Sequence, residues 1–87
     1  MKSSIAVACL LILTHSSFGQ DWSRYGHRSF NEKDYYGAAY YFNQALQNDS
    51  VNLETMWFYA ESERLANHYK KAGKAYKQLM ELDEKVA

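Results

Sequence analysis

Residues 35–49 read YYGAAYYFNQALQND, and residues 69–83 read YKKAGKAYKQLMELD. The two stretches align without a gap, and the paired positions are Tyr35 and Tyr69, Ala38 and Ala72, Phe42 and Tyr76, Gln44 and Gln78, and Asp49 and Asp83. A fixed period of about 20 to 50 residues is typical of stacked supersecondary units, because each unit has an apolar face that a neighbour must cover. The sequence therefore predicts two copies of one structural unit.

Each copy has the pattern of two helices. Apolar residues recur at spacings of three and four from Asp21 to Glu32 and from Tyr35 to Asn48, and the same spacing follows in the second copy. Asp34 is placed to cap the helix that starts at Tyr35, and Ser50 or Asn52 can cap the third helix. The chain has no proline, and no strand pattern of strict alternation competes, so the fold class predicted is all-α.

Small residues occupy the places where the helices should cross. Gly26 and Ala60 occur on the first helix of each copy, and Ala38 and Ala72 occur on the second helix. A small side chain at such a position leaves room for a large one on the facing helix. We therefore expect overpacking if Ala38 or Ala72 is enlarged.

The start of the chain has the composition of a secretory signal. A lysine near the start precedes the apolar run Ile5–Leu13, and Ser17 and Gly19 are the small residues that a signal peptidase reads. The sequence predicts a cleaved signal peptide over residues 1–19. The apolar run is too short for a helix that spans a bilayer, which takes about 20 residues. No stable transmembrane anchor is expected after cleavage.

The only cysteine, Cys9, lies inside that apolar run. The mature chain would then contain no cysteine, which excludes disulfides, thiol nucleophiles and cysteine metal sites. Ten lysines and arginines balance ten aspartates and glutamates, whereas nucleic-acid binding normally needs a basic stripe. The lysines at positions 70, 71, 74 and 77 are interpreted as a solvated helix face, and no nucleic-acid partner is expected.

The two copies resemble the tetratricopeptide repeat family. The resemblance depends on the following positions of this chain: Trp22, Tyr25, Gly26, Tyr35, Ala38, Phe42, Ala45 and Asp49, then Tyr59, Ala60, Tyr69, Ala72, Tyr76 and Asp83. It implies two repeats, at about 20–52 and 53–87, that stack as helix-turn-helix hairpins into a short right-handed α-solenoid. The sequence departs from the family where Lys33 and Asn67 replace the usual turn glycine, and where Met56 replaces a tryptophan.

Residues 33–42, behind a signal that ends in Phe-Gly-Gln, are also similar to the first repeats of envelope proteins from gliding-type bacteria. In those proteins the repeats often precede a propeller-like region and a peptidoglycan-binding domain of the outer membrane protein A type. This second resemblance implies an exported protein, periplasmic or associated with the outer membrane. It also implies that the chain corresponds to the leading segment of a longer protein.

In the repeat family the first helix of each repeat lines a concave face that holds a partner polypeptide. Carried over to this chain, the expected binding residues are Ser23, His27, Phe30, Asn31, Glu54, Trp57, Glu61, Arg64 and Leu65. Phe30 and Trp57 are the expected anchors, because buried aromatic contacts dominate interface energies. Phe30 has an equally supported interpretation as a core residue.

No catalytic motif competes with this interpretation. His27 and His68 are far apart in the sequence, and no HExxH or phosphate-binding glycine loop occurs. We expect no enzyme activity, no metal site and no cofactor. The function predicted is an exported scaffold for protein–protein interaction in the cell envelope, with an unidentified protein or peptide partner. The alternative is a self-association module or a fragment of a larger protein, because two repeats are fewer than the three or so usually needed for stability.

Overall fold

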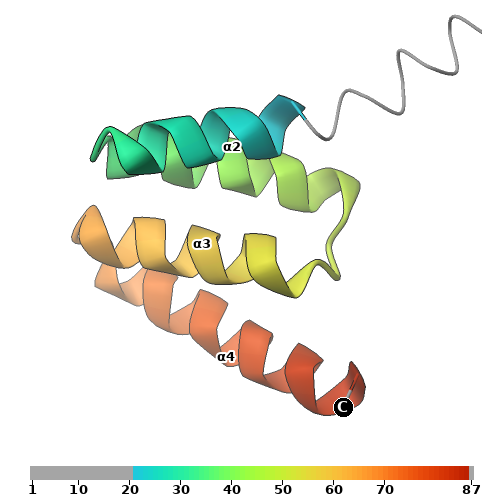
Figure 1. Ribbon diagram of the computed structural model, residues 1–87. Coiled ribbons are helices and arrows are strands. Elements are labelled where there is room, and N and C mark those ends of the chain that lie inside the picture. The colour runs from blue at the N-terminus through green and yellow to red at the C-terminus, as the bar shows by residue number, and fades with distance from the viewer. Residues whose placement is uncertain (1–20, 87) are drawn as a thin grey trace, which may run out of the picture.

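The computed structural model describes residues 21–86, so the predicted signal peptide lies outside the described residues. All the regular secondary structure of the described residues is helical and they contain no strand, which confirms the all-α prediction for this part. A first helix covers residues 21–31, and α2 (Tyr35–Asn48), α3 (Leu53–Leu65) and α4 (Tyr69–Val86) follow it. Successive helices run in opposite directions and lie side by side (Figure 1). Among residues 21–86, no helix combines the length and the apolar character needed to cross a bilayer.

Side-chain caps begin α2 and α3. The carboxylate of Asp34 accepts a hydrogen bond from the backbone N–H of Gly37 at 3.0 Å, as the sequence predicts. The side-chain oxygen of Asn52 accepts one from the N–H of Thr55 at 3.0 Å. Of the two candidate caps for α3, Asn52 therefore performs this role. Each cap satisfies one backbone donor that the first helical turn leaves free.

The turn between the first helix and α2 has the geometry of a Schellman motif. Lys33 has a φ of 64°. Its N–H donates to the carbonyl of Phe30 at 3.1 Å, and the N–H of Asp34 donates to the carbonyl of Ser29 at 2.8 Å. Glycine usually occupies the left-handed position of this motif, so lysine here adopts a strained backbone conformation.

The turn between α3 and α4 repeats this geometry. Asn67 has a φ of 66°. Its N–H donates to the carbonyl of Arg64 at 3.0 Å, and the N–H of His68 donates to the carbonyl of Glu63 at 2.8 Å. Every donor and acceptor is separated from its counterpart in the first turn by the same offset that aligns Tyr35 with Tyr69. The sequence repeat is therefore also a repeat of backbone hydrogen bonds.

Small residues lie at the helix crossings. Ala38 and Ala60 have no exposed surface, Ala72 is 3% exposed, and Gly26 is buried. At Gly26 the approach is so close that an added Cβ atom would lie 2.7 Å from Cε1 of Phe42. This confirms the predicted pairing of a small residue with a large one at this crossing.

The helix α3 packs against both α2 and α4 (Figure 1). It therefore connects the first hairpin, formed by the first helix and α2, with the second hairpin, formed by α3 and α4. Within the first hairpin, the ring of Tyr41 stacks on Trp22 with centroids 6.0 Å apart and tilts against Tyr25 at 5.6 Å. Aromatic rings thus fill the outer side of the first hairpin.

Candidate interaction surfaces

An aromatic cluster joins the two hairpins. The ring of Phe58 on α3 forms T-shaped pairs with His27 at 4.6 Å and with Phe30 at 5.4 Å between centroids, and it stacks on Phe42 at 5.6 Å. The ring of His27 also packs against Phe42 at 5.0 Å. Two residues of the expected binding face, His27 and Phe30, are thus half-buried between the hairpins and hold Phe58.

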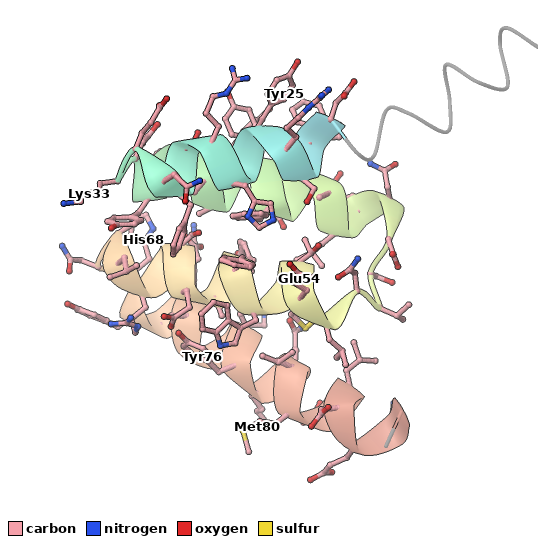
Figure 2. All side chains as sticks on the ribbon, in the orientation of Figure 1. Tyr25, Lys33, Glu54, His68, Tyr76 and Met80 are labelled. Atoms are coloured by element: carbon pink, nitrogen blue, oxygen red, sulfur yellow. The ribbon has the colours of Figure 1, made fainter. Side chains whose placement is uncertain are left out.

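The corresponding positions of the second hairpin are polar. The offset between the two copies carries positions 27, 30 and 42 to Glu61, Arg64 and Tyr76. Nε and Nη2 of Arg64 each donate to a carboxylate oxygen of Glu61 at 3.0 Å. The hydroxyl of Tyr76, which reaches from α4 toward α3 (Figure 2), donates to the same carboxylate. The second hairpin therefore closes with a hydrogen-bonded triad where the first hairpin receives an aromatic ring.

This triad favours the ionised glutamate. The hydrogen bonds from Arg64, and then from Tyr76, lower the pKa of Glu61 below its usual value. Partial burial, followed by the hydrogen bond to Glu61, raises the pKa of Tyr76. The bidentate pair of an arginine and a carboxylate has a fixed geometry. Glu61, Arg64 and Tyr76 therefore form an ordered polar patch on α3 and α4.

Trp57 lies on the same face of α3 as this patch. The positions 57, 61 and 64 are four and then three residues apart, which places them on one side of the helix. Trp57 is 43% exposed, and its ring forms a T-shaped pair with Phe58 with centroids 5.0 Å apart. We call the surface formed by Trp57, Glu61 and Arg64 of α3, together with Tyr76 of α4, the α3 face.

The remaining residues of the expected site differ in exposure. Ser23 and Leu65 are half-buried, and Asn31 and Glu54 are exposed. The expected set is therefore divided by the fold: its members His27 and Phe30 contact α3, and its members Trp57, Glu61 and Arg64 lie on the α3 face. The sequence contains one signal of this division. The residue of the first copy that corresponds to Phe58 is Arg24, so the two copies differ at the position whose ring packs against His27 and Phe30.

A groove between α2 and α4, with α3 as its floor, is a surface that the sequence did not indicate as a site. It consists of a hollow of about 510 Å³ and an adjoining one of about 190 Å³, which share Asn43, Tyr59 and Lys71. We call it the α2–α4 groove. The one signal in the sequence is that α2 carries no charged residue while lysines recur at positions 70, 71, 74 and 77 on α4.

A buried carboxylate lies at one end of this groove. Glu63 is 4% exposed; it accepts a hydrogen bond from the hydroxyl of Tyr59 at 3.2 Å and lies 3.0 Å from Nδ1 of His68. Burial, and then the charge of Glu63, raise the pKa of Tyr59 to about 12. The ring of Tyr36 covers His68 with centroids 5.5 Å apart. These contacts fix the turn between α3 and α4 against α2.

Within residues 21–86, histidines, aspartates and glutamates form no group of three or more that could hold a metal ion. Compared with protein-family models, with curated proteins and with solved structures, the chain matches none. The surfaces described above are therefore the basis for assigning a function.

Proposed function

We propose that this protein is a non-enzymatic scaffold of the tetratricopeptide repeat type, in which two stacked helical hairpins bind another polypeptide on the α3 face. The observation that carries the proposal is that an exposed tryptophan, Trp57, lies on one face of α3 with the hydrogen-bonded pair of Glu61 and Arg64. Trp57 is 43% exposed, while its neighbours Phe58 and Tyr59 are half-buried in the packing of α3. A large aromatic side chain that packing leaves outside is the type of residue that anchors protein interfaces.

The surroundings of Trp57 support this role. Tryptophan, tyrosine and arginine are the residue types that dominate interface energies, and the α3 face combines Trp57 with Arg64 and Tyr76. Arg64 and Tyr76 are held by Glu61 at defined positions. Side chains that are ordered before binding lose less entropy when a partner is bound. The face therefore suits recognition of a polypeptide with an apolar side chain beside polar groups.

Site-specific photo-crosslinking in the native cell tests this proposal. A photoreactive phenylalanine derivative replaces either Trp57 or Tyr25, whose side chain is 41% exposed and points outward from the first helix (Figure 2). We expect a defined crosslinked protein from position 57 and none from position 25. Trp57→Ala should also weaken binding of the partner so identified by about 30-fold, which corresponds to a loss of about 2 kcal/mol. Equal labelling from both positions, or an unchanged affinity of Trp57→Ala, would contradict the proposal.

We further propose that the protein is exported to the cell envelope, since residues 1–19 have the charged start, apolar run and small residues of a signal peptide. Amino-terminal sequencing of the protein purified from its own cells should begin at Gln20. A mature chain that keeps Met1 would show this part of the proposal to be wrong, without affecting the binding face.

A further inference from the structure

We propose that the α2–α4 groove is a second interaction surface, distinct from the α3 face, and that it binds an acidic segment of a partner polypeptide. The groove is long enough for such a segment. Its two hollows share residues and are lined from Tyr36 to Gln47 of α2. At 1.5 Å per helical residue this stretch of α2 measures about 17 Å, which about five residues of extended chain cover.

The charge of the groove indicates which kind of segment it binds. Lys71 and Lys74 line it, and the facing helix α2 carries no charged side chain across Tyr35–Asn48. None of the ion pairs described within residues 21–86 includes either lysine. Two cations that none of these ion pairs includes leave the groove positive, so carboxylates of a bound segment would complement it.

The only carboxylate that lines the groove does not neutralise these lysines. Glu63 is 4% exposed, and its oxygens are occupied by the hydroxyl of Tyr59 and by Nδ1 of His68. The carboxylate of Glu63 contacts Tyr59 on α3 and His68 in the turn that precedes α4. The exposed part of the groove therefore keeps its positive character.

The remaining lining is apolar or uncharged. Met56 and Leu46 contribute apolar surface, and the amides of Asn43 and Gln47 can hydrogen-bond a bound backbone. A segment that fits has apolar side chains directed to the floor and aspartates or glutamates directed to α4. Such an amphipathic segment would cover surface that is apolar in its centre and charged on one side.

Peptide selection on the purified full chain tests the inference. The probe is a phage-displayed library of random dodecapeptides, selected on the wild-type chain and counter-selected on Lys71→Glu/Lys74→Glu. The surviving peptides should be enriched in aspartate and glutamate between apolar residues. Synthesised and titrated by fluorescence anisotropy, they should bind Lys71→Glu/Lys74→Glu about tenfold more weakly, because two exposed ion pairs of up to about 1 kcal/mol each are lost.

The matched control is Lys70→Glu/Lys77→Glu, which makes the same charge change on the same helix outside the groove. We expect it to change the affinity by less than about twofold, and circular dichroism should show that both variants keep the helical fold. Equal losses in the two variants would overturn the inference, since the lysines would then act only through total charge. Peptides without acidic enrichment would overturn it as well.

Two further outcomes would assign the groove to another occupant and overturn the inference. One is a dimer of the wild-type chain in sedimentation that Lys71→Glu/Lys74→Glu dissolves, because a second copy would then fill the groove. The other is displacement of the selected peptides by single-stranded RNA at lower concentration than by any acidic peptide. Neither outcome changes the expected crosslinking at Trp57, so failure of this inference is distinguishable from failure of the proposed function.

Discussion

Replacing Gly26 by alanine tests how closely the first helix and α2 approach each other. A Cβ atom at Gly26 would lie 2.7, 2.8 and 2.9 Å from three ring atoms of Phe42. Phe42 has no exposed surface, so its ring cannot turn into solvent to relieve the clash. Gly73 on α4 is the matched control, because nothing lies within 4 Å of a Cβ atom built there.

The comparison isolates the steric effect. Neither glycine has a positive φ, and both lie inside helices, where alanine is favoured over glycine by about 1 kcal/mol. Gly73→Ala should therefore stabilise the protein by about 1 kcal/mol. Gly26→Ala gains the same amount but loses about 1–3 kcal/mol to overpacking. The two free energies of unfolding should differ by about 1–3 kcal/mol.

Thermal unfolding followed by far-ultraviolet circular dichroism measures this difference. A domain of this size changes its Tm by about 4–8 °C per kcal/mol, so Gly26→Ala should melt at least about 4 °C below Gly73→Ala. Equal melting temperatures would refute the reasoning, since the approach of Phe42 to the first helix would then be looser than described.

Three further predictions concern α3 and the turns. Phe58→Ala should lower the free energy of unfolding by about 2–3 kcal/mol, because its half-buried ring joins the hairpins. The control Met80→Ala, at a residue that is 66% exposed, should lower it by less than about 0.5 kcal/mol. Equal losses in urea titrations would argue against that packing. Burial and the neighbouring carboxylate raise the pKa of Tyr59 to about 12, above the ordinary 10.0. The folded state therefore favours the neutral phenol. This contribution to stability is complete below about pH 10 and is lost as the pH rises through about 12. Tyr59→Phe should flatten the fall in stability over that interval in denaturant titrations, and a curve parallel to the wild type would contradict this. Lys33→Gly should raise the Tm more than Asn67→Gly, because asparagine tolerates the left-handed region better than lysine; the reverse order of melting temperatures would speak against a strained lysine.

The helices and their ends could be predicted from the sequence because they depend on local interactions. The bounds of α2, the cap at Asp34 and the burial of Ala38 and Ala72 all follow from residue types within a few positions of each other. The gapless alignment of the two copies also predicts the equivalence of the two turns. Lys33 and Asn67 adopt the same left-handed conformation although neither is the expected glycine, since the hydrogen bonds of the turn select the backbone conformation.

The surfaces required the tertiary structure. The sequence places both Phe30 and Trp57 among the expected binding residues, but Phe58 contacts Phe30 from across the hairpin boundary while Trp57 stays 43% exposed. The α2–α4 groove likewise joins residues of three helices that are distant in the sequence. Residue patterns were enough to predict which segments are helical and that they form two equivalent hairpins, because those properties arise from neighbouring residues. Only the packing of α3 between α2 and α4 decided which side chains remain accessible, because accessibility depends on contacts between residues far apart along the chain.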